Sequence, residues 1–334
     1  MTRHLSDREH RTRWRGPGGR TTSRRTGALG FSVAMTAVLA LSACAGPAGG
    51  TGAAAGGGSP SAPPSTPEAY RKALSAAVKP LDAALAAFEK AAAYGVLTDR
   101  MTTAEQAAPR TLSELRGMTP PTAVGTEHVA LVTAVGRLVD DLHYLGQTVS
   151  GRRLCTASAV RAQLSRAAGA AAVRDAVKAL AAKEPPGAIR LSVPAAGRAL
   201  GRRPPNGSRV RPGDRSGLSE LSVDNDGSAD AVITLAIGRR PLYSVYVRKG
   251  GKYAVPRVKD GTYTVFYSTG SGWDAAAKAF STGCEFQRFE KPLTFGTART
   301  ATGTGYSRWK IILQPVDGGN ARTEPVGPGD FPTG

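Results

Sequence analysis

The residue whose type and surroundings point most directly to chemistry is Cys44, the first of three cysteines in a chain of 334 residues. A polar leader, residues 1–25, carries eight arginines and two acidic residues, and an apolar run from Ala28 to Leu41 follows it. A basic leader before a short apolar run is typical of a secretory signal peptide. The run is shorter than the roughly 20 apolar residues that a membrane-spanning helix needs. The sequence therefore predicts export of the chain.

Residues 41–44, Leu-Ser-Ala-Cys, resemble the lipobox of bacterial lipoproteins at all four positions. The resemblance implies thioether attachment of diacylglycerol to the Cys44 sulfur, cleavage after Ala43, and palmitate among the lipid chains. It predicts a mature protein anchored on the extracytoplasmic face of the cell membrane. An uncleaved signal anchor is the alternative. Residues 23–25, Ser-Arg-Arg, form a partial twin-arginine signal, so the sequence leaves both the Sec and the Tat export routes open.

Cys155 and Cys284 are the two other cysteines, and an exported chain matures where disulfides persist. We expect them to pair, which would tie a helical part of the chain to a strand-rich part and stabilise it by up to roughly 5 kcal/mol. Two buried free thiols are the alternative, because sequence does not give the distance between them. A Cys155 nucleophile with His143 as its base is disfavoured, since no catalytic signature surrounds Cys155.

The remaining candidate chemistries are weak. His128 and His143 are the only histidines after residue 44, and on one helix they would lie roughly 22 Å apart along its axis, too far to share a metal ion. Residues 224–227 begin like a calcium loop but lack its bidentate glutamate. Ser307 and Lys310 have the Ser-x-x-Lys spacing of penicillin-recognising enzymes without the partner motifs. We therefore expect no metal, no cofactor and no catalytic residues, and we favour a role other than catalysis.

Charge and aromatic residues suggest what the chain contacts. The net charge is +19, and 36 basic and 23 acidic residues remain after the leader, a net charge of +13. This balance favours anionic surfaces such as wall polymers or phospholipid, and export argues against nucleic acid. Arg202 and Arg203, in a segment rich in arginine and proline, are candidate contacts to such a surface. Trp273 is a candidate for stacking on a carbohydrate, with core packing as the alternative.

The elements that position these residues divide into helices and strands. Apolar residues at alternating spacings of three and four predict helices over residues 74–88 and 124–149. Weaker patterns predict two more over 101–115 and 160–180, which together suggest a bundle of about four helices. Pro80 and Pro109 should kink the first two helices or mark breaks in them.

After residue 217, short β-prone runs alternate with turn residues and predict an antiparallel sandwich of about seven strands. The runs are 218–223, 231–237, 242–248, 253–258, 262–267, 286–295 and 306–313. Gly250-Gly251 and Asp260-Gly261 are predicted to close hairpins, and Pro256 should place its strand at an edge. Residues 274–280 should form a short helix after a glycine-rich loop.

Residues 250–266, which contain Asp-Gly-Thr-Tyr-Thr-Val, resemble the strand-turn-strand of transthyretin-like and carboxypeptidase-regulatory-like β-sandwich modules. Residues 68–183 and 218–332 together are similar to uncharacterised actinobacterial lipoproteins, with Cys-Glu-Phe at 284–286 among the shared features, and this resemblance implies no activity.

The predicted fold is α+β with two domains. We expect a signal peptide at 1–43, a disordered tether at 44–67, a helical bundle at 68–183, an arginine and proline-rich linker at 184–217, a β-sandwich at 218–316 and a glycine and proline-rich tail at 317–334. The predicted role is binding or structural, at the cell envelope, with an anionic wall polymer, a carbohydrate or an envelope protein as partner. An envelope enzyme is the alternative.

Overall fold

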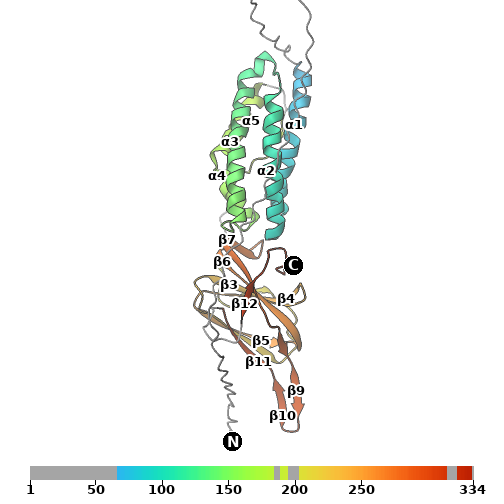
Figure 1. Ribbon diagram of the computed structural model, residues 1–334, viewed down its shortest axis with the longest axis vertical. Coiled ribbons are helices and arrows are strands. Elements are labelled where there is room, and N and C mark those ends of the chain that lie inside the picture. Colours follow the sequence, from blue (N-terminus) through green and yellow to red (C-terminus); the bar gives the residue numbers. More distant parts are fainter. Residues whose placement is uncertain (1–65, 184–188, 195–202, 314–321, 333–334) are drawn as a thin grey trace, which may run out of the picture. The chain divides into compact units, whose positions relative to one another are not determined.

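The computed structural model describes residues 66–183, 189–194, 203–313 and 322–332. Cys44 and Arg202 lie outside these residues, as do the predicted signal peptide and almost all of the predicted tether. The described chain is an α+β protein in which helices precede a mostly antiparallel set of strands (Figure 1).

Five α-helices form the first part of the described chain: α1 Pro67–Ala87, α2 Tyr94–Arg116, α3 Gly125–Ser150, α4 Ala157–Arg166 and α5 Ala168–Lys183. Thr66 caps α1 by accepting a hydrogen bond from the Ala69 amide at 3.3 Å, and Pro67 follows at the first helical position. The fourth predicted helix is in fact two, because Ala167 adopts an extended conformation, with ψ at 141°, between α4 and α5. Pro80 and Pro109 interrupt neither α1 nor α2, contrary to one of the predicted outcomes.

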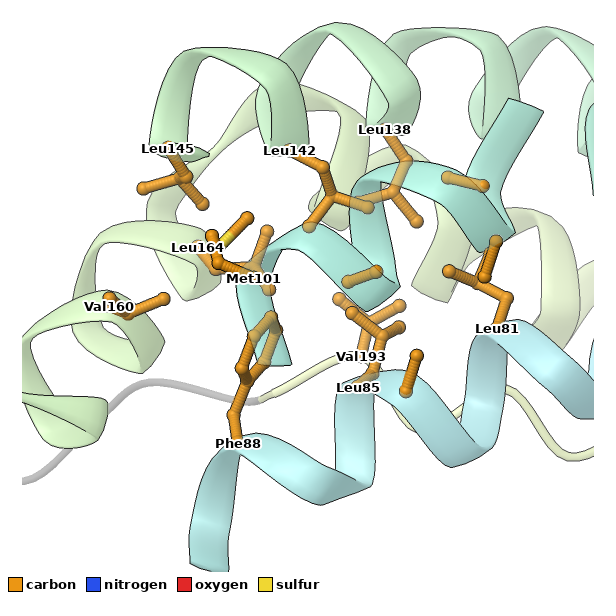
Figure 2. Packing of buried hydrophobic residues seen from close by; sticks show 14 of the residues in the cluster. Leu81, Leu85, Phe88, Met101, Leu138, Leu142, Leu145, Val160, Leu164 and Val193 are labelled. Carbon is orange, nitrogen blue, oxygen red and sulfur yellow. The ribbon is translucent and has the colours of Figure 1, made fainter. Parts of the chain in front are cut away.

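The predicted apolar stripes form the core of the helical part. Helix α3 packs against α2 and α5, and α1 packs against α2. Figure 2 shows Leu81, Leu85, Leu138 and Leu142 from these stripes meeting in one cluster with Met101. Every residue of the first stripe is buried, since a helix turn of 3.6 residues keeps spacings of three and four on one face.

The segment predicted as a solvated linker contributes to this helical core. Leu191 and Val193 are each 8 % exposed and pack among the helical side chains. The Ser192 amide donates to Asp82 Oδ1 at 2.6 Å, and Arg174 Nη1 donates to the Pro194 carbonyl at 3.1 Å. The prediction was wrong for residues 189–194, because two apolar side chains are enough to hold so short a stretch against the helices.

Strands follow from residue 209 onward, and each predicted run overlaps an observed strand. Their bounds are β1 Arg209–Arg211, β2 Ser219–Asn225, β3 Asp230–Ile237, β4 Arg240–Val247, β5 Gly251–Val258, β6 Gly261–Asp274, β7 Ala279–Phe289, β8 Leu293–Phe295, β9 Thr297–Thr300, β10 Gly303–Tyr306, β11 Arg308–Ile312 and β12 Thr323–Pro325. The order β1-β4-β3-β6-β7-β12, with β8 also beside β6, makes a seven-stranded sheet, and β11-β2-β5 makes a three-stranded sheet. Strands β9 and β10 pair only with each other among the described strands.

The two larger sheets share one buried apolar cluster, which gives a sandwich-like arrangement. Leu221 and Val255 of the smaller sheet pack in this cluster with Ile233, Val245 and Val265 of the larger sheet. Most strand pairs are antiparallel, as predicted, but β11 runs parallel to β2. More than 80 residues of intervening chain separate β2 from β11, which permits a parallel pair, whereas a two-residue turn joins only antiparallel neighbours.

Both predicted hairpins are wrong. Gly250-Gly251 joins β4 to β5, and Asp260-Gly261 joins β5 to β6, but β5 pairs with β2 in the smaller sheet. These tight turns therefore carry the chain from one sheet to the other and back. Pro256 lies in β5, an edge strand of that sheet, which confirms the prediction for this residue.

Three further segments differ from their predicted structure. Arg209–Arg211 of the predicted linker pairs with β4, and Thr323–Pro325 of the predicted tail pairs with β7. Residues 274–280 contain no helix: β6 ends at Asp274, whose Oδ1 accepts hydrogen bonds from two backbone amides of the turn that leads to β7. The aspartate side chain thus stabilises a turn by accepting hydrogen bonds from its backbone amides. The residues after Asp274 therefore resemble a helix in sequence but do not form one.

Candidate functional site

Cys155 and Cys284 form the predicted disulfide. Their Cα atoms are 6.2 Å apart, and the bond joins positions 129 residues apart in the sequence. The flanking backbone is paired as well, since the Cys155 amide donates to the Ser281 carbonyl at 2.8 Å and the Cys284 amide to the Arg152 carbonyl at 3.2 Å. The bond links the loop before α4 to strand β7, and it leaves neither sulfur as a free nucleophile.

His128 has a structural environment. It is 4 % exposed, with the Tyr70 hydroxyl 2.9 Å from Nδ1 and the Leu115 carbonyl 3.0 Å from Nε2. A carbonyl only accepts, so Nε2 carries the proton and Nδ1 accepts from the hydroxyl. Burial lowers the pKa of His128, and the hydrogen bond to Leu115 opposes this only in part. His128 is therefore a neutral core residue.

His143 lies on the surface and shares no site with His128. Its Nδ1 is 3.5 Å from Glu105 Oε1, and its Nε2 is 3.0 Å from the Gln147 amide nitrogen. Among the described residues, no group of three or more His, Cys, Asp and Glu side chains is placed to hold a metal ion.

Trp273 is a core residue rather than an exposed platform for a sugar. It is 7 % exposed and packs edge-on against Tyr246 and Phe280, with ring centroids 5.2 Å and 5.5 Å away. The predicted glycine-rich loop before it is part of β6, and Trp273 is one of the buried residues of that strand. Aromatic side chains of this region that remain exposed are Tyr306 and Trp309.

Arg203 is engaged within the chain. Its Nε and Nη2 donate to the two carboxylate oxygens of Asp230 at 2.7 Å and 2.5 Å. Burial favours a raised pKa for Asp230, but hydrogen bonds from Arg203, the Tyr246 hydroxyl and the Lys249 amide outweigh it and lower that pKa to about 2. A bidentate pair of this kind holds the guanidinium in place, so Arg203 serves to fix the segment before β1 on the larger sheet.

A cavity between the two sheets is a stronger candidate for a binding site than any of these residues. It has a volume of about 350 Å³ and lies where β3, β4 and the start of β6 face β5. Its walls are mainly apolar, supplied by Leu235, Ile237, Leu242, Val255, Val258 and Tyr263. Volumes of roughly 300 to 1,000 Å³ with apolar walls and a few polar groups are typical of small-molecule sites.

Two unsatisfied polar atoms belong to residues that line this cavity. The Tyr243 hydroxyl and Arg215 Nε are buried, and neither has a hydrogen-bond partner among the described residues. Arg215 is anchored through Nη2, which donates to the Pro256 carbonyl at 3.1 Å, and its guanidinium carbon lies 5.9 Å from the centre of the Tyr243 ring. Burial raises the pKa of Tyr243, so this hydroxyl is protonated at neutral pH.

Two glycines position Arg215 beside the cavity. A Cβ on Gly213, where φ is +62°, would lie 2.5 Å from the Leu242 carbonyl oxygen, and a Cβ on Gly217 would lie 1.9 Å from that of Val258. The chain between them therefore passes closer to β4 and β5 than a larger residue would allow. Glycine at both ends of a short polar stretch was the available sequence signal, but nothing in the sequence indicates which strands that stretch approaches.

The mouth of the cavity carries positive charge. Its lining includes four basic residues, Arg215, Arg240, Arg257 and Lys259, and two acidic residues, Asp214 and Asp260. Asp214 pairs with Lys259 at 2.9 Å, and Asp260 accepts two hydrogen bonds from Thr297 at 3.0 Å each. Both acids are therefore occupied. Arg240 and Arg257 are exposed, and neither forms an ion pair with a described residue.

No described helix combines the length with the hydropathy that a bilayer-crossing segment requires. Comparison of the chain with protein-family models, with curated proteins and with solved structures found no match in any of the three.

Proposed function

We propose that this chain is the precursor of an exported lipoprotein, anchored by lipid on Cys44 to the outer face of the cell membrane, where it acts as a binding protein. The observation that carries the anchor is the Leu-Ser-Ala-Cys motif at residues 41–44, placed directly after a basic leader and a short apolar run. The proposed mature protein has a tether, a helical bundle and a β-sandwich of the kind found in transthyretin-like modules.

The binding role is supported by the cavity between the two sheets. Its walls are apolar and its few polar groups are concentrated at Tyr243, Arg215 and the mouth. The described lining has no histidine, cysteine or serine, and its two carboxylates are already paired with other groups. Acid–base or nucleophilic catalysis needs a group that can exchange a proton or attack a substrate. The Tyr243 hydroxyl, which has no hydrogen-bond partner among the described residues, is poorly suited to this because burial raises its pKa, so these residues favour binding over an envelope enzyme.

The anchor is tested by comparing the wild-type chain with Cys44→Ala in bacterial cells that modify lipoproteins. Wild-type protein is expected in the membrane pellet and in the detergent phase of a phase partition, and it should incorporate labelled palmitate. Cys44→Ala should lose all three properties. Ser59→Ala, in the proposed tether, is the control and should behave as wild type.

Membrane association of Cys44→Ala without labelled palmitate would contradict the lipid anchor. That result would mean that the apolar run from Ala28 to Leu41 remains attached as a signal anchor.

A further inference from the structure

We propose that the cavity between the two sheets binds a single-chain amphipathic anion, whose apolar body lies between the sheets and whose carboxylate lies beside Arg215 and Tyr243. The inference deepens the proposed binding role and rests on it. It does not depend on the lipid anchor, because the residues that line the cavity lie within 214–263.

The apolar walls require an apolar ligand body. Leu235, Leu242, Val255 and Val258 present hydrocarbon from both sheets, and Ile237, which is 55 % exposed, extends that surface to the mouth. A ligand that covers these side chains removes apolar surface from water, which favours binding in proportion to the area buried. A volume of about 350 Å³ suits one short chain rather than a pair of lipid tails.

The unsatisfied atoms require an acceptor. A buried polar group without a partner destabilises a protein, and such groups are rare in folded chains. Arg215 Nε can only donate, and the Tyr243 hydroxyl, protonated at neutral pH, can donate as well. A carboxylate accepts hydrogen bonds through both of its oxygens, and bonds from a charged donor are the stronger kind.

The charges at the mouth select an anion over a cation. Asp214 and Asp260 are held by Lys259 and Thr297, whereas Arg240 and Arg257 have no ionic partner among the described residues. A site lined by an excess of one charge concentrates ligands of the opposite charge.

A shallow depression adjoins this mouth and leaves room beyond a carboxylate. It shares Asp214, Arg240 and Leu242 with the cavity. A ligand with a larger anionic head group could therefore extend along the surface past Arg240.

The test compares three ligands that share one apolar body and differ in head charge: decanoate, decanol and decyltrimethylammonium. Binding is measured by calorimetry on the full chain carrying Cys44→Ala, purified without detergent. Decanoate is expected to bind at least tenfold more tightly than either of the other two. Equal affinities for all three, or no binding of decanoate, would overturn the proposal.

Variants locate the site. The double variant Arg240→Gln/Arg257→Gln should weaken decanoate at least fivefold and leave decanol unchanged, and Tyr243→Phe should also weaken decanoate. The double variant Arg110→Gln/Arg116→Gln removes the same two charges from exposed positions on α2, which contributes nothing to the cavity lining, and should have no effect. Thermal unfolding of each variant shows that the fold is retained. A loss of affinity in Arg110→Gln/Arg116→Gln equal to that in Arg240→Gln/Arg257→Gln would overturn the assignment of the site, because it would mean that only net charge is sensed.

A separate experiment with vesicles of phosphatidylglycerol tests whether the anion is a free molecule or the head group of a membrane lipid. The same Cys44→Ala chain should bind decanoate in solution and show no vesicle binding that depends on Arg240 and Arg257. Vesicle binding that needs both arginines, without decanoate binding, would overturn the cavity proposal in favour of a lipid surface. Failure of the Cys44→Ala fractionation experiment with normal decanoate binding would remove the anchor alone, so the two failures are distinguishable.

Discussion

Removing the Cys155–Cys284 bond should show how much the disulfide contributes to the stability of the protein. The bond closes a loop between positions 129 residues apart. On the chain-entropy account, a cross-link of this span removes about 16 to 17 cal/mol/K from the unfolded chain, or about 5 kcal/mol at 25 °C. Folded proteins typically have free energies of unfolding of only about 5 to 15 kcal/mol, so the disulfide contributes a large share of the total.

Three variants separate the bond from the packing of its sulfurs: Cys155→Ala, Cys284→Ala and the double replacement. Each single change removes the whole bond, so each should lower the free energy of unfolding by about 5 kcal/mol, and the double change should lower it by little more. The double-mutant cycle should therefore give a coupling energy close to the full loss. The two residues are 4 % and 2 % exposed, so modest packing losses will add to each figure.

The assay is equilibrium unfolding in guanidinium chloride, followed by far-ultraviolet circular dichroism. Wild-type protein unfolded in the presence of a reductant should match the double variant. A coupling energy below about 1 kcal/mol, with single losses that simply add, would refute the reasoning, because it would mean that the bond does not restrict the unfolded chain as its span requires.

Three further predictions concern stability. Tyr243→Phe should stabilise the ligand-free protein by about 1 kcal/mol in urea unfolding, because it removes a buried hydroxyl without a partner; a loss of stability would show that the hydroxyl is satisfied. Burial lowers the pKa of His128 below 6.5, so its contribution to stability is full above pH 6.5 and is lost as pH falls through 6.5 toward the folded-state pKa, by at most about 1.4 kcal/mol per pH unit. His128→Gln should flatten the pH profile of urea unfolding between pH 7 and 5, and an unchanged profile would contradict this. Gly169→Ala should destabilise by about 1 to 3 kcal/mol, because its Cβ would lie 2.5 Å from the backbone of α3, whereas Gly136→Ala, with nothing within 4 Å, should stabilise by about 0.5 to 1 kcal/mol; thermal unfolding that ranked the two glycine variants in the opposite order would be evidence against this packing.

The sequence by itself determined the elements whose signals are local. The spacing of Leu74, Val78 and Leu81 on one helix face, and the β-prone runs after residue 217, decided where helices and strands form, because burial of one face imposes a fixed period on the chain. The disulfide could also be predicted from the sequence, because the two cysteines that follow Cys44 in a chain predicted to be exported can form only one pair. Pro256 was placed correctly at a sheet edge because proline lacks the amide that a central strand needs.

Only the tertiary structure decided which strands are neighbours and which side chains meet. Gly250-Gly251 has the letters of a hairpin turn, yet β5 pairs with β2, because burying apolar faces of both sheets in one core outweighs the preference of a two-residue turn. The same packing brings Arg215 to Tyr243 across 28 positions of sequence and buries Trp273. The periodicity of apolar residues indicates that a residue is buried, but it does not indicate which residues it packs against. The core positions could therefore be predicted from the sequence, whereas the cavity between the sheets could not.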